Sequence, residues 1–293
     1  RVDNSNDIDV GDDGNAFRNR IQNVGTGVIV NASTDVRLDD NDITNVQDFG
    51  IKVVGGSSNV VVEDHTITGL GGTANTGIYV NGSSDVTVGG GSGHGNDVSG
   101  FNTGIRIANS TDSEISNNEL DNINNVNILV SNSNGTSLAD GIRLIENDID
   151  GGKTGILVSN SDFATVDDNI IKNLTGNAIQ FSGSTNGEIT HNDIDDVANT
   201  GILLTNLSND TLIRDNNIDG AKNGIHVYGT DTNQISDITI DDNDVSDFDN
   251  KGIALVNTFN SAVTDNVINN GSNGSVGTGV YVNKSHGVVI GGD

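Results

Sequence analysis

Three residues of a recurring G-I-x-V phrase carry side chains that could do chemistry together. Lys52, Tyr79 and Arg106 occupy the x position of three consecutive phrases. A lysine or arginine can neutralise the carboxylate of a uronic acid, and a tyrosine, lysine or arginine can move the proton at C5. The acidic run Glu63-Asp64-His65 lies near them in the sequence. These residues form a candidate site for an acidic polysaccharide, although exposed strand positions favour mixed polar and aromatic residues without any function.

Aspartates provide a second candidate site, because they stand just before an Asn that recurs along the chain. Stacked repeats would align their carboxylates about 4.8 Å apart, where neighbouring charges in water repel by roughly 0.9 kcal/mol. Bound Ca²⁺ would relieve this repulsion, and so would screening by external salt, which needs no specific site. The sequence therefore predicts either a calcium-binding stripe or a solvated acidic face, formed by Asp39, Asp40, Asp167, Asp168, Asp215, Asp241, Asp242 and Asp265.

The composition limits the partners that the protein can have. The 293 residues carry a formal net charge of −28, from 41 acidic residues against 13 Lys and Arg. Such a surface repels nucleic acids and anionic lipids. No stretch is apolar enough to span a membrane, so we expect no membrane insertion by this segment. The absence of Cys excludes a disulfide scaffold.

A repeat of 22 to 31 residues organises the chain. Counting from one Asn-x-(Ile/Val/Leu) phrase to the next, the interval from Asn19 to Asn41 is 22 residues and that from His65 to Asn96 is 31. Periods in this range indicate a solenoid. The repeats start at Asn19, Asn41, His65 (standing in for Asn), Asn96, Asn118, Asn147, Asn169, Asn192, Asn216, Asn243 and Asn266.

Each repeat contains three apolar segments that read as short strands. The Ile of the "NDI" phrase comes first, the G-I-x-V phrase second and an x-V-x-V phrase third. Apolar residues alternate within the second and third segments, as in half-buried strands. Stacking such strands turn on turn would build a continuous apolar core. We expect one inward ladder to contain Ile78, Ile105, Ile156, Ile179, Ile202, Ile225 and Ile253.

This pattern resembles the parallel β-helix repeats of the pectate-lyase-like superfamily and of NosD-type surface and periplasmic proteins. The resemblance covers residues 19 to 290 and implies an all-β, right-handed parallel β-helix of about eleven turns. Residues 19–293 would form the repeats, and residues 1–18 a lead-in or cap in which Phe17 is bulky. The chain lacks the Arg-x-Pro-x-x-Arg phrase of pectate lyases and the Asp-Pro-His-Glu phrase of mannuronan epimerases.

Because this fold carries many functions, two hypotheses remain open. The first is a non-enzymatic extracellular rod, a structural or adhesive segment of a surface protein, filament or fibre, which would not turn over polyuronates. The alternative is a polysaccharide lyase, an epimerase or a carbohydrate binder that uses Lys52, Tyr79 and Arg106. A secreted or displayed protein could also be glycosylated at Asn-x-Ser/Thr sequons, which occur at Asn31, Asn81, Asn109, Asn134, Asn173, Asn206, Asn209, Asn270, Asn273 and Asn283.

The C-terminal segment suggests association. Val288 and Ile290 alternate as another strand, and no amphipathic helix or polar blocking strand follows them. An uncovered solenoid end exposes unpaired strand edges. The sequence therefore predicts self-association or continuation of the coil end to end.

Overall fold

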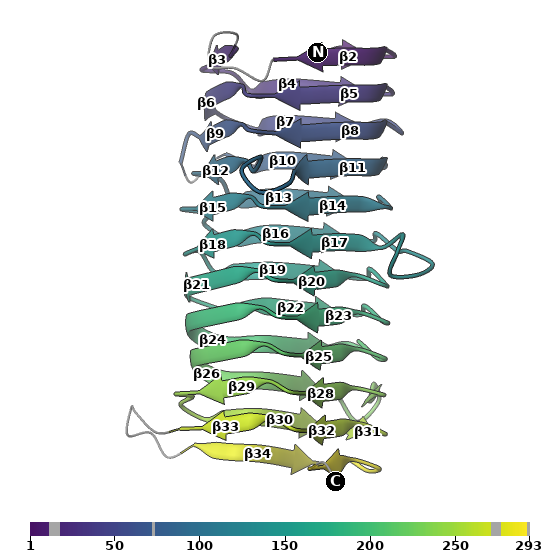
Figure 1. Ribbon diagram of the computed structural model, residues 1–293, viewed down its shortest axis with the longest axis vertical. Helices are drawn as coiled ribbons and strands as arrows, with labels where there is room; N and C mark the ends of the chain where they lie inside the picture. The colour runs from purple at the N-terminus through teal and green to yellow at the C-terminus, as the bar shows by residue number, and fades with distance from the viewer. Residues whose placement is uncertain (12–17, 72–73, 271–276, 292–293) are drawn as a thin grey trace.

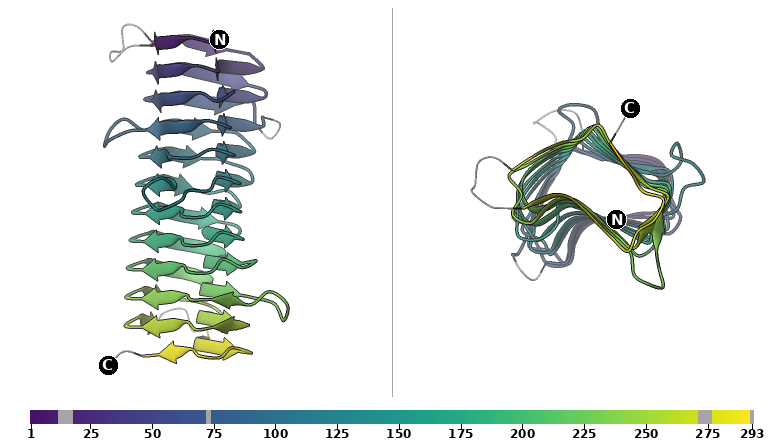
Figure 2. Two further views of the ribbon diagram at one scale, coloured as in Figure 1. Left: turned by 90° about the vertical axis from the view of Figure 1, so that its right-hand side faces the viewer. Right: turned by 90° about the horizontal axis from the view of Figure 1, so that it is seen from below.

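The protein is a rod of stacked parallel strands (Figures 1 and 2). The computed structural model describes residues 1–11, 18–71, 74–270 and 277–291. Every strand pairing among them is parallel, and the strands wind about eleven turns. No helix of these residues has the length and apolar character that a membrane span requires. The predicted parallel solenoid is therefore confirmed.

The three segments of the repeat form three columns of strands. The "NDI" column contains β3 (Arg20–Gln22), β6 (Asp42–Val46), β9 (Thr66–Gly69), β12 (Asp97–Ser99), β15 (Glu119–Asp121), β18 (Asp148–Asp150), β21 (Ile170–Leu174), β29 (Asp244–Ser246) and β33 (Val267–Asn269). The G-I-x-V column contains β4 (Thr26–Asn31), β7 (Phe49–Val54), β10 (Thr76–Asn81), β13 (Thr103–Ala108), β16 (Val126–Ser131), β19 (Thr154–Ser159), β22 (Ile179–Ser182), β30 (Lys251–Val256) and β34 (Thr278–Asn283).

The third column is a separate 12-stranded sheet on the other side of the core. It contains β2 (Asn6–Val10), β5 (Thr34–Asp39), β8 (Ser58–Glu63), β11 (Ser84–Gly89), β14 (Ser113–Ser116), β17 (Ile142–Ile145), β20 (Thr165–Asp167), β23 (Glu188–Thr190), β25 (Leu212–Arg214), β28 (Thr239–Asp241), β32 (Ala262–Thr264) and β35 (Val289–Ile290). A small pair, β27 (Ile235–Ser236) and β31 (Thr258–Phe259), lies apart from it.

Two turns differ from the expected three short strands. In β24 (Asp193–Thr205) and β26 (Asn217–Tyr228) the "NDI" and G-I-x-V segments run on as one bent strand. The register between these two strands shifts from Val197 to Thr200, at the bend. As a result, the first two columns join into a single 21-stranded sheet.

The expected inward ladder is present. Ile78 pairs with Ile105, and the series continues through Ile128 and Ile156 to Ile253. All of these side chains are fully buried. Because side chains alternate between the two faces of a strand, burying this ladder fixes the residue between Ile and Val on the outer face.

The recurring Asn residues form a buried hydrogen-bonded ladder. Asn192 is representative, since its Oδ1 accepts from the backbone N and Nδ2 of Asn169 at 3.1 and 2.9 Å. Its Nδ2 donates in turn to Oδ1 of Asn216 at 2.9 Å. His65 replaces Asn in one turn, where its Nδ1 accepts from the backbone N of Asn41 at 2.9 Å. The ladder therefore provides hydrogen-bond partners for backbone groups at the turn that joins each strand of the 12-stranded sheet to the next strand of the "NDI" column.

A serine ladder, which the sequence analysis did not identify, satisfies the opposite turn. The backbone N of Ser133, for example, donates to Oγ of Ser161 at 3.0 Å. The signal was present in the sequence as a Ser that follows each G-I-x-V strand by a few residues. The ladder contains Ser33, Ser57, Ser83, Ser110, Ser133, Ser161, Ser184 and Ser208.

The two ends of the rod differ from the interior. At the N-terminal end, β1 (Val2–Asp3) pairs with β4 and β2 pairs with β5, so the stacked strands begin before Asn19. Phe17 lies outside the described residues. At the other end, Val289 and Ile290 are 58% and 56% exposed, and Val288 is partly buried against the core. Within the described residues, β34 and β35 are each paired along one edge.

Candidate functional site

Lys52, Tyr79 and Arg106 lie side by side on the outer face of the G-I-x-V column. Lys52 on β7 pairs with Tyr79 on β10, which pairs with Arg106 on β13. Their neighbours in the same register are Ile29 and Leu129. All three side chains are half-buried by the strands next to them. The outward stacking expected from the repeat thus places two cations on either side of one phenol ring.

An aromatic residue that sequence reasoning missed completes this group. The ring of Phe49 stacks on that of Tyr79, with centroids 5.3 Å apart and an interplanar angle of 26°. Lys52 Nζ lies 4.8 Å from the Phe49 centroid and 5.9 Å from that of Tyr79. Arg106 Cζ lies 5.5 Å from the Tyr79 centroid. These distances permit cation–π attraction, which holds the two cations against the rings.

The two cations of this group have no acidic partner among the described residues. Neither Lys52 nor Arg106 makes an ion pair there, although Arg37, Arg214 and other cations of the rod do. Arg106 Nε is buried and donates no hydrogen bond to a described residue. A buried donor without a partner costs free energy, and it is the remaining guanidinium N–H groups of Arg106 that can meet an acceptor supplied by a ligand.

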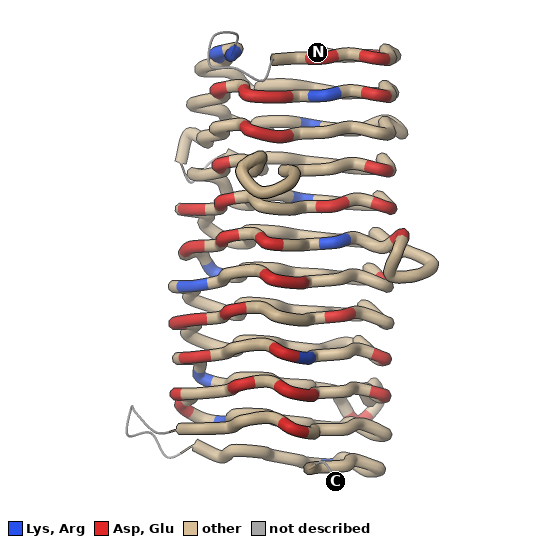
Figure 3. The backbone as a smooth tube through the Cα atoms, in the orientation of Figure 1, with Lys and Arg blue, Asp and Glu red and all other residues tan. Residues whose placement is uncertain are grey.

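The surrounding strands explain why no acid is near. The G-I-x-V segments contain no Asp or Glu in any turn. Acidic residues are instead spread along the rest of the rod, from one end to the other (Figure 3). We call the outer surface of these segments the acid-free face; it comprises residues 26–31, 49–54, 76–81, 103–108, 126–131, 154–159, 179–182, 200–205, 223–228, 251–256 and 278–283.

A second basic and aromatic group lies toward the C-terminal end of the same face. The rings of His226 and Tyr228 meet edge to face, with centroids 5.6 Å apart. Lys251 Nζ lies 4.9 Å from the centroid of Tyr281. Burial lowers the pKa of His226, and the charge of Lys251 lowers it further, so its ring favours the neutral form. Cationic and aromatic side chains therefore recur along the acid-free face.

The acidic run near Tyr79 in the sequence lies elsewhere in space. Glu63 belongs to β8, in the 12-stranded sheet, and its carboxylate bonds to Arg37 Nε at 2.8 Å. His65 is 1% exposed within the Asn ladder. Neither residue belongs to the acid-free face, because the chain turns a corner between β7 and β8.

The aspartates proposed to bind Ca²⁺ line the turn at the far edge of the 12-stranded sheet. Five of them, Asp40, Asp168, Asp215, Asp242 and Asp265, have φ between 47° and 54°. Asp tolerates this left-handed conformation better than most residues, which gives the repeated Asp a structural reason. In the register of the 12-stranded sheet, the positions between Glu63 and Asp167 are occupied by Gly89, Ser116 and Ile145. None of these residues is acidic, so the row of carboxylates is interrupted midway.

Basic side chains neutralise several of these aspartates, Arg37 from the same strand and Arg18 and Arg214 from adjacent turns. Asp39 pairs with Arg37 at 3.0 Å, Asp40 with Arg18 at 2.7 Å and Asp241 with Arg214 at 2.9 Å. Such pairs reduce the repulsion that a row of carboxylates would otherwise create. Part of the charge that would attract a cation is therefore already compensated within the protein.

Two clusters on this edge have donor atoms close enough together to hold a metal ion. One consists of Asp167, Asp168 and His191, and the other of Glu63, Asp64 and His94. His191 Nδ1 lies 2.8 Å from Asp167, and its Nε2 lies 3.6 Å from Asp215. The imidazole in each cluster suits a transition metal better than Ca²⁺, which prefers oxygen ligands alone. Of these residues the sequence had indicated only Asp167 and Asp168 as metal ligands; it indicated neither Glu63 and Asp64 nor the two histidines, which come from the following turn.

Comparisons with known proteins agree with the architecture. No curated protein sequence matches this chain. The crystal structure of a DFA-IIIase mutant from Arthrobacter chlorophenolicus A6 in complex with DFA-III superposes with a TM-score of 0.57 at 12% identity, covering 91% of this chain and 68% of that one. The same enzyme in complex with GF2 gives 0.57 at 13%, covering 91% and 67%.

The periplasmic alginate epimerase AlgG gives a TM-score of 0.46 at 12% identity, over 91% of this chain and 73% of that one, a likeness too weak to carry an argument. At identities this low, the DFA-IIIase superpositions establish the fold alone. The family model of the right-handed β-helix region matches residues 6–138 and 103–243. These two matches together cover most of the chain, which therefore belongs to the right-handed β-helix family.

Proposed function

We propose that this protein binds an acidic polysaccharide through the acid-free face, at Lys52, Tyr79 and Arg106. One observation carries the proposal: two cations, neither of which has an acidic partner among the described residues, flank an aromatic ring on a face whose segments contain no Asp or Glu, in a protein of net charge −28. Most other cations of the described residues, such as Arg18 and Arg37, lie beside acids instead.

The side chains match the two kinds of surface that a uronic acid presents. The rings of Phe49 and Tyr79 offer an apolar platform for the C–H face of a sugar. Arg106 can bind a carboxylate with directed hydrogen bonds, and Lys52 supplies a point charge one turn away. The DFA-IIIase structures support the proposal only in that a β-helix of similar fold is found in complex with DFA-III and with GF2. An acidic polysaccharide of this kind would be met outside the cytoplasm, where we place the protein.

Proton abstraction from the bound sugar is a second candidate function, favoured by the position of Tyr79 between two cations. There the Tyr79 oxygen could remove the C5 proton of a bound uronate while Lys52 and Arg106 neutralise the sugar carboxylate. Unsaturated, ultraviolet-absorbing products, lost in Tyr79→Phe, would establish a lyase. Binding without such products, and without exchange of the C5 proton with solvent deuterium, would leave a carbohydrate binder.

The binding test uses calorimetric titration with oligogalacturonate and oligomannuronate. Lys52→Ala and Arg106→Ala should each weaken binding about tenfold or more, since each removes a charge-assisted contact worth about 1.5–3 kcal/mol. Lys222→Ala is the matched control, because Lys222 is also an exposed cation without an ion pair among the described residues but lies outside the acid-free face. Equal effects of all three substitutions would mean that only net charge matters, and the proposal would be wrong.

A further inference from the structure

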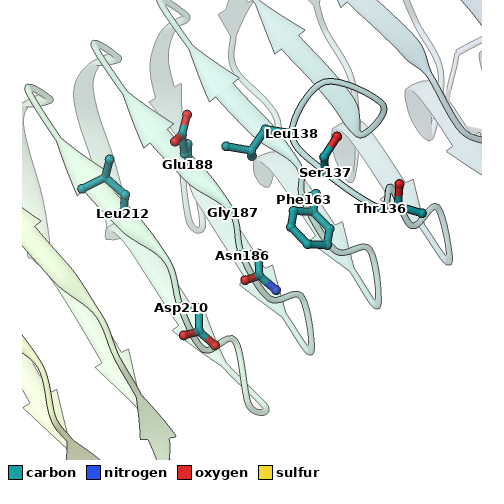
Figure 4. Close-up of a pocket in the computed structure, with 9 residues that line it drawn as sticks. All are labelled: Thr136, Ser137, Leu138, Phe163, Asn186, Gly187, Glu188, Asp210 and Leu212. Atoms are coloured by element: carbon teal, nitrogen blue, oxygen red, sulfur yellow. The ribbon is translucent and has the colours of Figure 1, made fainter.

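A groove of about 330 Å³ lies on the 12-stranded sheet, away from the acid-free face. Its roof is the loop 132–141, which projects from the rod between β16 and β17 (Figures 1 and 4). Leu138 comes from this loop, and the other walls come from the three turns that follow it. Those walls include Phe163, Asn186, Glu188, Asp210 and Leu212.

The roof is held in place by hydrogen bonds and close backbone packing. The Asp140 carboxylate accepts from the backbone N of Thr136 and Ser137 at 3.1 and 2.6 Å, and from both of their hydroxyls. Gly141 passes so near the next turn that a Cβ there would lie 1.8 Å from the carbonyl oxygen of Phe163. The hydrogen bonds to Asp140 make the tip of the loop compact, and the close packing of Gly141 fixes its end against the next turn, so the groove beneath it is preformed.

Phe163 occupies a backbone position that suits a different kind of residue. Its φ is 60°, and the same place in the next two turns is taken by Asn186 and Asp210, at 56° and 52°. Asn and Asp tolerate this left-handed region, whereas a bulky aromatic residue there is strained. In six other turns the equivalent residues are short and polar, namely Asp35, Asn59, Asp85, Asp112, Asp237 and Asn260. Because this strain has a cost in stability, the position of the ring directly below the roof suggests that the ring contacts a ligand in the groove.

The walls combine apolar and hydrogen-bond-accepting groups but no cation. Leu138, Phe163 and Leu212 supply apolar contact, while the carboxylates of Glu188 and Asp210 can accept hydrogen bonds. Neither carboxylate makes an ion pair within the part of the chain that the structure describes. An anionic ligand would be repelled here, whereas the hydroxyl groups of an uncharged sugar can donate to both carboxylates.

We infer that this groove binds one uncharged sugar unit of a glycan, with its C–H face on the Phe163 ring. The volume lies at the lower end of the range for small-molecule sites, which suits one sugar and not a longer stretch. The site is independent of the acid-free face, because it lies on the opposite column of strands and selects a ligand of different charge.

The test is titration of the whole chain with uncharged trisaccharides of glucose, xylose or fructose, and with trigalacturonate for comparison. At least one uncharged trisaccharide should bind, and Phe163→Asn should weaken that binding about tenfold or more. Phe163→Asn restores the residue type of the neighbouring turns, so its melting temperature should equal or exceed that of the wild type. Phe163→Tyr keeps the ring and should retain the binding.

The remaining outcomes decide against the site. If none of the uncharged trisaccharides binds, or if Phe163→Asn binds as the wild type does, the groove is not a sugar site. In the Lys52→Ala/Arg106→Ala variant, where the acid-free face no longer contributes, a preference for trigalacturonate that Phe163→Asn abolishes would also overturn the inference, because it would contradict the charge argument. The double variant Lys52→Ala/Arg106→Ala should leave binding of the uncharged trisaccharide unchanged, so failure of one proposal can be distinguished from failure of the other.

Discussion

His65 is expected to make the stability of the rod depend on pH between 6.5 and 4. It replaces Asn in the buried ladder, and burial lowers its pKa from 6.5 to about 4. In the folded state the ring stays neutral through this range, whereas in the unfolded chain it takes up a proton below pH 6.5. Proton uptake by the unfolded chain therefore lowers the free energy of unfolding as the pH falls from 6.5 toward 4, and the full stability of the rod is present above pH 6.5.

The size of the effect follows from the shift of the pKa. A difference of about 2.5 between 6.5 and about 4 corresponds to about 3 kcal/mol, at 1.36 kcal/mol for each unit. At pH 4.5 the linkage relation gives about 2.5 kcal/mol of this loss. Because His65 is 1% exposed, solvent screening should reduce the figure little.

His65→Asn isolates this contribution, since it restores the ladder residue and removes the titrating group. The free energy of unfolding of the variant relative to the wild type should rise by about 2.5 kcal/mol between pH 7.5 and pH 4.5, measured by denaturant titration. His286→Asn, at an exposed histidine, is the control for general effects of removing an imidazole. An equal difference at both pH values, or an NMR titration of His65 centred near pH 6.5, would refute the reasoning.

Four further predictions concern the core, the ladder, the acidic edge and the end of the rod. Ile202→Asp should lower the free energy of unfolding by several kcal/mol, because it buries an unpaired charge; melting like the wild type would show that the register is wrong. Asn192→Ala should cost about 3 kcal/mol in a denaturant titration, since it leaves the backbone N of Asn169 and other buried groups without partners; a loss below about 1 kcal/mol would contradict that role. Thermal melts with chelator, with CaCl₂ and with NaCl should differ if the aspartate edge binds Ca²⁺ or if salt screens the repulsion between its carboxylates; identical curves would exclude both the calcium site and the screening. Sedimentation should reveal concentration-dependent association that Val289→Lys and Ile290→Lys abolish; a monomer at all concentrations would contradict end-to-end contact.

The repeat, the strand columns and the inward ladder could be predicted from the sequence because one physical requirement recurs in every turn. Each G-I-x-V segment must bury its Ile and Val, and slipping the register by one residue would turn them outward. That constraint alone places Lys52, Tyr79 and Arg106 next to one another on the outer face. The bent strands β24 and β26 were not predicted, since the corner that joins two segments depends on local backbone geometry and not on the apolar pattern.

Contacts between turns were decided by the tertiary structure. The sequence contained the aspartates of the acidic edge, but not that His191 would lie 2.8 Å from Asp167 or that Arg214 would neutralise Asp241. It contained Phe163, but not the loop 132–141 that covers it or the left-handed backbone that strains it. The apolar pattern recurs in every turn and can therefore be predicted from the period. The contact partner of a side chain one turn away depends on how each turn folds. Because the turns differ in length, no fixed number of residues separates the two partners in the sequence.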